Sequence, residues 1–147
     1  MLGQLLVGGL VSVINIAIHS LIMATVVGVA QRASEKKLLH PSLFLAAVMI
    51  PIVSILMAAH TIEVMVWASA YALVDAAPEN VQIVYFAFVN YATLGYGDIV
   101  PVDRWKLLGP ITAMNGALMF GWSTAVMFEV LRKTMARSAS ESGSPRD

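Results

Sequence analysis

Long apolar runs alternate with short polar breaks along this chain, and three of the runs are long enough to cross a lipid bilayer. The first covers residues 1–31, which contain no lysine, arginine, aspartate or glutamate. The second extends from about 43 to 71 and the third from about 107 to 131. A spanning helix needs about 20 predominantly apolar residues. The pattern therefore predicts an all-α integral membrane protein with three transmembrane helices.

A fourth apolar run, residues 83–92, lies between the second and third spans and is too short to cross a bilayer. Its length favours a re-entrant helix, which membranes tolerate only where protein or water surrounds it. Pro78 and Glu79 predict the start of this helix, because proline suits a first helical position and a carboxylate suits the positive end of the dipole. The carboxyl end of the helix would offer a partial negative charge to a cation.

The first run has a second interpretation, as a cleaved signal peptide. Signal peptides carry a basic amino-terminal region and an apolar stretch of about 7–15 residues, and neither feature fits the run. We therefore interpret it as a transmembrane helix. The expected organisation is an amino-terminal helix (1–31), a short charged cytoplasmic link (32–41), a pore domain (42–133) and a serine-rich cytoplasmic tail that we expect to be disordered (134–147).

Composition and charge placement support a membrane location and give an orientation. Apolar residues make up 59% of the chain and charged residues 12%, against about 45–50% and 25% in soluble domains. Basic residues gather in the link and the tail, whereas four acids lie between the second and third spans. The positive-inside rule places link and tail in the cytoplasm and the amino terminus outside the cell membrane. No basic stripe suggests nucleic acid, and the absence of cysteine excludes disulfides.

The segment after the short helix combines a threonine with two glycines that flank a tyrosine. Gly95 and Gly97 tolerate positive φ at little steric cost, so alternate peptide planes can aim their carbonyl oxygens the same way. Four copies around an axis would form stacked oxygen rings that replace the water around K⁺. The alternative is an ordinary glycine-rich loop.

Residues 93–98 resemble the selectivity-filter signature of tetrameric potassium channels, and residues 43–131 resemble the small prokaryotic channels of the two-span pore type, with one added helix. The resemblance implies a homotetramer in a lipid bilayer that passes K⁺ and needs no cofactor. It implies K⁺ sites formed by the Thr93 hydroxyl and by the backbone carbonyls of Thr93, Leu94, Gly95 and Tyr96.

The same resemblance implies a brace behind the filter. Asp98 matches an aspartate that pairs with an aromatic residue of the pore helix, and Tyr85 stands where many members carry tryptophan. Leu94 replaces the commoner valine and Ala92 a second threonine. Neither departure removes an ion ligand.

The third span is similar to the inner helix of that family. Gly116 and Gly121 resemble the paired glycines of a hinge that opens the inner gate. Helical spacing then predicts a pore-lining face with a hydrophobic constriction at Phe128. That face comprises Ala117, Phe120, Thr124 and Phe128. The alternative is that these residues pack helix against helix, since glycines favour close approach.

Ionisable side chains stand inside two of the spans. His60 and Glu63 share a helical face, and His19 lies on one face of the first span with Asn15. One hypothesis is that the two histidines and Glu63 form a proton-sensitive cluster that shifts gating. The other is a static hydrogen-bonded contact between the first two spans. The spacing of His60 and Glu63 is not that of a zinc-protease helix, and the chain has only three histidines, so neither feature predicts a metal site.

The sequence thus predicts a K⁺-selective channel and not an enzyme, because no nucleophile, base and orienting group can be assembled from its residues. Two alternatives stay open: a weakly selective cation channel, and a non-conducting accessory or scaffold subunit. No arginine ladder of the kind that voltage sensing requires lies in any span.

Overall fold

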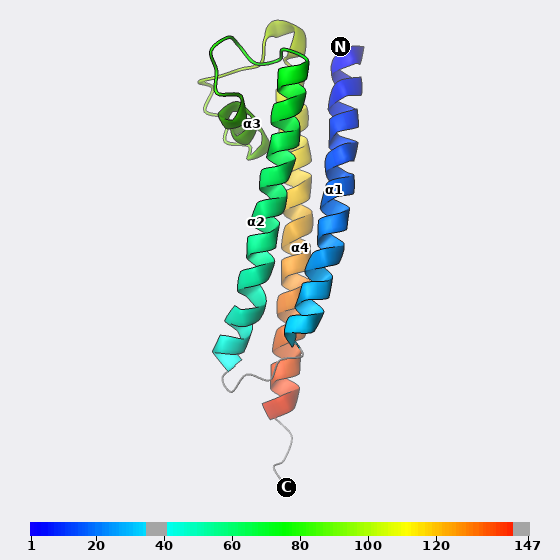
Figure 1. Cartoon of the computed structure of the whole chain (residues 1–147), viewed down its shortest axis with the longest axis vertical. Helices are drawn as coiled ribbons and strands as arrows, with labels where there is room; N and C mark the ends of the chain where they lie inside the picture. Colours follow the sequence, from blue (N-terminus) through cyan, green and yellow to red (C-terminus); the bar gives the residue numbers. More distant parts are fainter. Residues whose placement is uncertain (35–40, 143–147) are drawn as a thin grey trace.

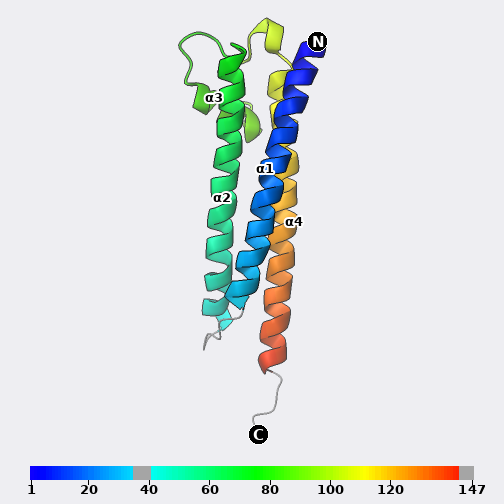
Figure 2. The same cartoon turned by 45° about the vertical axis from the view of Figure 1, so that its right-hand side comes forward.

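The computed structural model describes residues 1–34 and 41–142, which form helices and no strand. Three long helices lie side by side, and a short one packs beside two of them near one end (Figures 1 and 2). The elements in chain order are α1 (Leu2–Ser34), α2 (Pro41–Leu73), α3 (Ile83–Tyr91), the 3-10 turn η1 (Asp103–Trp105) and α4 (Leu108–Ser142).

The three long helices confirm the predicted spans. The stretches long and apolar enough to cross a membrane are Leu2–Arg32, Leu43–Leu73 and Asp103–Ala136, the third of which begins in η1 just before α4. Helix α3 has 9 residues, which corresponds to about 14 Å of helix at 1.5 Å per residue and is far short of a bilayer. It contacts α2 and α4, which cover one side of it, whereas Val84, Tyr85 and Phe88 are exposed in the single chain. A re-entrant helix needs protein or water around it.

Two boundaries differ from the sequence interpretation. Helix α3 begins at Ile83 after an N-cap at Gln82, and Pro78 lies in the preceding turns. The chain cannot be helical from Pro78 onward because Asn80 adopts a φ of 61°. The prediction of a helix start at Pro78 was therefore wrong.

Helix α4 continues to Ser142, so the predicted disorder of the tail is wrong for residues 134–142. No glycine or proline occurs between Trp122 and Ser142, and nothing in that stretch breaks a helix. Residues 143–147 of the tail, and residues 35–40 of the predicted cytoplasmic link, lie outside the described residues.

The core has two apolar clusters separated by a polar layer. The cluster nearer α3 includes Trp67, Tyr71, Phe86, Tyr91 and Leu108. The cluster toward the other end includes Met23, Val26, Val48, Ile52 and Val130. Between them the buried side chains are polar: Asn15, His19, Glu63, Asn115 and Ser123. Buried polar groups in a helical membrane protein are costly and mark functional or specificity-giving contacts.

Helix α1 is joined to the start of α4. The Gln4 side-chain oxygen accepts a hydrogen bond from the Leu107 backbone N–H at 2.8 Å, which satisfies one of the donors that a helix start leaves unpaired. One turn further, a Cβ at Gly8 would lie 2.8 Å from Cδ1 of Ile111. The two helices therefore approach closely at this point, and α1 is an integral part of the bundle.

Candidate functional site

The segment that resembles a filter, residues 93–98 (the filter segment), is hydrogen-bonded to the last turn of α3. The backbone N–H groups of Ala92 and Leu94 donate to the carbonyls of Phe88 and Val89 at 2.8 and 3.0 Å. The N–H of Thr93 donates to the carbonyl of Asn90 at 3.1 Å. The segment therefore begins directly after the carboxyl end of α3 and is hydrogen-bonded to it.

The sign of the backbone φ angle alternates from one residue of the segment to the next. Thr93, Gly95 and Gly97 have positive φ angles of 59°, 59° and 76°, whereas Leu94 and Tyr96 do not. Near-mirror-image conformations at successive residues turn successive peptide dipoles toward the same side. Left-handed backbone at a residue other than glycine costs about 1–2 kcal/mol, and Thr93 bears this cost. Strain of this kind is typical of functional sites.

The brace that the sequence predicted is formed within the chain. The Tyr85 hydroxyl of α3 donates to Oδ2 of Asp98 at 3.0 Å. The bond to this carboxylate raises the pKa of Tyr85 above its ordinary value. The contact joins the body of the short helix to the outer end of the filter segment, so the segment is held at both ends.

We expect Tyr85→Phe to loosen the filter segment, because phenylalanine offers no donor to Asp98. On the filter role that the resemblance implies, the expected result is a several-fold fall in the ratio of K⁺ to Na⁺ flux through reconstituted protein, with no change in its expression or assembly. Tyr85→Trp is the matched variant: its indole N–H restores a donor on an aromatic ring and should keep the ratio nearer that of the unmodified protein. Equal ratios for the two variants would show that the hydrogen bond has no role.

The residues predicted to line a pore share an uncovered face of α4. The side chains of Ala117, Thr124 and Phe128 are exposed in the single chain, the last of them at 65%. Phe120 is 38% exposed, and its ring packs against His60 and Tyr91 with centroid distances of 4.6 and 5.5 Å. The opposite face of α4 contacts α1, α2 and α3. The predicted lining face is therefore available for contact with other molecules or with an aqueous pathway.

The two glycines predicted as a hinge have different surroundings. A Cβ at Gly116 would overlap the backbone carbonyl of Tyr91, at the end of α3. At Gly121 an added Cβ would meet no atom of the described residues within 4 Å. The absence of a side chain at Gly116 therefore allows α4 to pack closely against α3. Gly121 has no such packing role, so of the two glycines it is the one available as a hinge.

The three ionisable residues that the sequence singled out lie together. Nδ1 of His19 is 2.7 Å from Oε1 of Glu63, and Nδ1 of His60 is 3.2 Å from Oε2 of Glu63. His19 and Glu63 are fully buried, and His60 is 13% exposed. The structure thus contains the predicted contact between the first two spans. The proton-sensing hypothesis stays a prediction.

Two further residues complete this group, and sequence reasoning missed both. The Tyr91 hydroxyl of α3 donates to Oε2 of Glu63. Oγ of Ser123, on α4, lies 3.1 Å from Nε2 of His60 and 3.4 Å from Nε2 of His19. We call His19, His60, Glu63, Tyr91 and Ser123 the buried cluster. It joins all four helices at one level.

A second polar contact set lies beside the cluster. Oδ1 of Asn115 accepts hydrogen bonds from Nε1 of Trp67 at 3.0 Å and from Nδ2 of Asn15 at 3.1 Å. The sequence indicated that Asn15 faces a neighbouring helix, and its side chain is fully buried. Asn115 was missed because a single amide in an apolar run gives no sign of its partner.

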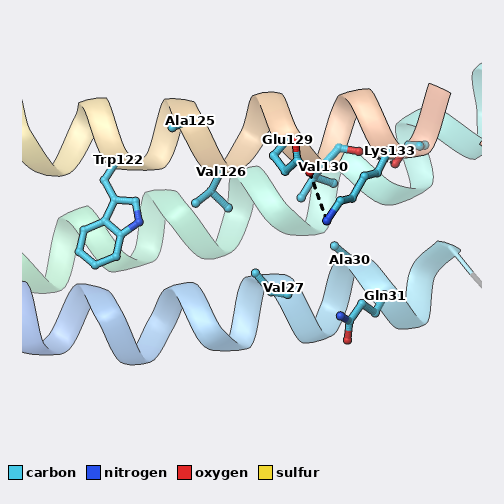
Figure 3. Close-up of a pocket in the computed structure, with 10 residues that line it drawn as sticks. Val27, Ala30, Gln31, Trp122, Ala125, Val126, Glu129, Val130 and Lys133 are labelled. Carbon is cyan, nitrogen blue, oxygen red and sulfur yellow. Dashed lines mark hydrogen bonds and ion pairs between the residues drawn. The ribbon is translucent and has the colours of Figure 1, made fainter. Parts of the chain in front are cut away.

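A cavity of about 500 Å³ lies between the ends of α1 and α4 that are remote from α3 (Figure 3). Apolar side chains such as Val27 and Val126 form much of its wall. At its rim Glu129 pairs with Lys133 at 3.2 Å, and both carboxylate oxygens of Glu129 also accept from Arg132 at 2.9 Å. Glu129 is therefore neutralised by bases of its own helix.

The protein has three membrane-length helices, and the short helix α3 is inserted between the second and the third. Directly after α3 the chain forms a segment in which the sign of φ alternates. These features define a helical membrane protein of the pore-loop class. A family model described as ion channel matches residues 59–133, just over half of the chain. The chain belongs to this ion channel family. The match includes α3, the filter segment and most of α4, and it leaves α1 outside. No curated protein and no solved structure matches the chain.

Proposed function

We propose that this protein is a K⁺-selective channel in which four copies surround one central pore. The observation that carries the proposal is the alternation of positive φ at Thr93, Gly95 and Gly97, directly after the carboxyl end of α3. Backbone of this form offers a row of carbonyl oxygens, and such oxygens replace the hydration shell of K⁺. The Thr93 hydroxyl adds one further oxygen at the inner end. No cofactor is needed, because the ion passes down its own gradient.

The exposure of the filter side chains supports assembly from several copies. Leu94 and Tyr96 are 51% and 67% exposed in the single chain, although strained backbone persists only where its surroundings hold it. A cleft of about 570 Å³ also lies open between the filter segment and the start of α4. Symmetric neighbours would cover both, and the uncovered face of α4 would then turn toward the central axis.

The placement of the chain ends supports the orientation expected from charge. The amino terminus and the filter segment lie at one end of the bundle, and the carboxyl end of α4 lies at the other (Figures 1 and 2). With the basic end of α4 in the cytoplasm, the filter mouth and the amino terminus face outward across the cell membrane. Cations would enter the filter from a mouth that carries the acids Asp98 and Asp103.

The test is ion uptake into liposomes that contain the purified full-length protein. We expect uptake of K⁺ with little uptake of Na⁺. Equal uptake of the two ions would support a weakly selective cation channel instead, and no uptake would support an accessory or scaffold subunit. Crosslinking of the purified protein should give four linked chains, and a monomer would contradict the proposal.

Gly95→Ala is the matched control for this uptake. An alanine at φ 59° costs about 1–2 kcal/mol in each chain and favours a rotated peptide plane at the centre of the strip. We expect uptake to fall to that of protein-free liposomes while the variant still assembles. A variant that conducts normally would show that these carbonyls are not the ion ligands.

A further inference from the structure

The buried cluster has fewer hydrogens than its contacts require. Six close contacts join its side chains: His19, His60 and Tyr91 each contact the Glu63 carboxylate, both histidines contact the Ser123 hydroxyl, and Nδ1 of His60 also contacts the Tyr91 hydroxyl. With Glu63 ionised and both imidazoles neutral, the two histidines, the tyrosine and the serine supply one hydrogen each. Four hydrogens are fewer than these six contacts, so lone pairs face each other at some of them. A further positive charge, either a proton or a metal ion, would satisfy such a contact.

The orientation of the two imidazole rings indicates where that charge belongs. Both rings turn Nδ1 toward Glu63 and Nε2 toward Ser123. A serine oxygen has two lone pairs, so it can accept from both Nε2–H groups at once. Both Nδ1 atoms then carry a free lone pair and point toward the same carboxylate. Metal-bound histidines show this arrangement, in which an outer hydrogen bond to the second ring nitrogen fixes the tautomer.

We propose that His19, His60 and Glu63 form a binding site for a divalent transition metal ion of the zinc class. Two histidines and one glutamate are a known zinc ligand set, and imidazole nitrogen suits such ions. The ligand atoms of the three residues lie within 4.8 Å of one another. Zinc bonds of about 2.0–2.1 Å place tetrahedral ligand atoms about 3.3 Å apart, so the side chains need only small shifts to close around the ion.

The surroundings of the three ligands fit such an ion. The Tyr91 hydroxyl lies 3.2 Å from Nδ1 of His60, close enough to supply or to orient a fourth ligand. The single negative charge of Glu63 is buried, and a divalent cation would compensate it within the bundle. The spacing of His60 and Glu63 did not predict this site, because the third ligand comes from another helix.

The bound ion would fasten α1 to α2 directly, and through Tyr91 and Ser123 it would brace α3 and α4 at the same level. This assigns a role to α1, which lies outside the matched family region. The inference is independent of the proposed K⁺ selectivity, since it concerns metal content and stability and not flux.

The test is Zn²⁺ binding by the full-length protein, purified in detergent and stripped with a chelator. We expect about one Zn²⁺ per chain, with a rise in the thermal unfolding temperature that the chelator reverses. Co²⁺ in place of Zn²⁺ should give the visible absorption of a four-coordinate site with nitrogen and oxygen ligands. A protein that takes up no Zn²⁺ and whose unfolding temperature does not respond to it would overturn the proposal and leave a proton as the compensating charge.

Variants separate this site from incidental binding. His19→Ala and the nearly isosteric Glu63→Gln should each weaken Zn²⁺ binding by more than about tenfold, and Ser123→Ala, which removes the outer hydrogen bonds, by about 10–100-fold. His40→Ala removes the remaining histidine of the chain and should leave binding unchanged. Because Glu63→Gln preserves side-chain shape, it keeps the test decisive if an alanine variant fails to fold. Undiminished binding by both Glu63→Gln and Ser123→Ala would overturn the assignment of these ligands.

Discussion

Gly116→Ala is expected to abolish K⁺ flux and to lower the thermal stability of the protein, although it adds only one methyl group. The new Cβ would overlap the backbone carbonyl of Tyr91. Tyr91 cannot easily move, because its hydroxyl is held by Glu63 and its ring is buried in the core. Overpacking in a close-packed interior typically costs about 1–3 kcal/mol. The new Cβ and the Tyr91 carbonyl are both fixed to helix backbone and cannot rotate apart, so we expect a cost at or above the upper end of this range.

The loss of flux follows from where the overlap occurs. Tyr91 is the last residue of α3, two positions before Thr93. Moving its carbonyl away from α4 displaces the turn that delivers the chain into the filter segment. Thermal unfolding of purified protein and K⁺ uptake into liposomes measure the two effects separately.

Gly121→Ala is the matched control on the same helix. An added Cβ there meets no described atom within 4 Å, and alanine is favoured over glycine in a helix by about 0.5–1 kcal/mol. We therefore expect equal or higher thermal stability and normal assembly. If the two substitutions lowered stability equally, the close approach of α4 to α3 would not be the cause. A change in gating confined to Gly121→Ala would support a hinge at that residue alone.

The contrast between these glycines illustrates what the sequence could not provide. Both resembled members of a hinge pair, because spacing along one helix is visible in the sequence. The atom that excludes a side chain at Gly116 belongs to a different helix. Close approach between elements depends on how they pack, and periodicity carries no information about it.

The spans themselves were predictable because a bilayer imposes a length and a composition on anything that crosses it. The contact between Tyr85 and Asp98 was expected from the resemblance of residues 93–98 to a potassium-channel filter, and it is present in the structure. The filter role of that segment stays a prediction. The start of α3 was mispredicted from Pro78, since a proline that suits a helix start suits a turn equally well. The end of α4 was mispredicted because serine-rich composition was taken as a sign of disorder.

The buried cluster was predicted in part. His19, His60 and Glu63 attracted attention because ionisable groups in a span are costly, so they had to find partners. Tyr91 and Ser123 gave no such sign: a tyrosine at the end of a helix and a serine in an apolar span are both common. Their roles depend on the level at which α3 and α4 meet α1 and α2.

Asn115→Leu is expected to destabilise the protein strongly, since it removes an acceptor shared by two buried donors. Oδ1 of Asn115 accepts from the Trp67 indole and from the Asn15 amide, and all three side chains are almost fully buried. A buried donor left without an acceptor costs about 1–3 kcal/mol. Leucine has the same branching and the same number of side-chain heavy atoms as asparagine, so no cavity forms. Nδ2 of Asn15 keeps the Glu63 backbone carbonyl as an acceptor at 3.3 Å, so the Trp67 indole is the donor left without one. The free energy of unfolding in detergent should therefore fall by about 1–3 kcal/mol.

Asn15→Leu, at the partner residue, should cost much less. It removes the donor, which also bonds the Glu63 backbone carbonyl at 3.3 Å, and leaves Oδ1 of Asn115 still paired with Trp67. It also removes Oδ1 of Asn15, which is buried and has no hydrogen-bond partner among the described residues. A loss of no more than about 1 kcal/mol is expected, close to the value of one typical hydrogen bond. Because the two asparagines share one hydrogen bond, a model based on that bond alone gives equal losses. Asn115→Leu leaves the buried Trp67 donor without an acceptor, whereas Asn15→Leu leaves no donor without one. Asn115 is therefore the more sensitive position, and equal measured losses would contradict this explanation.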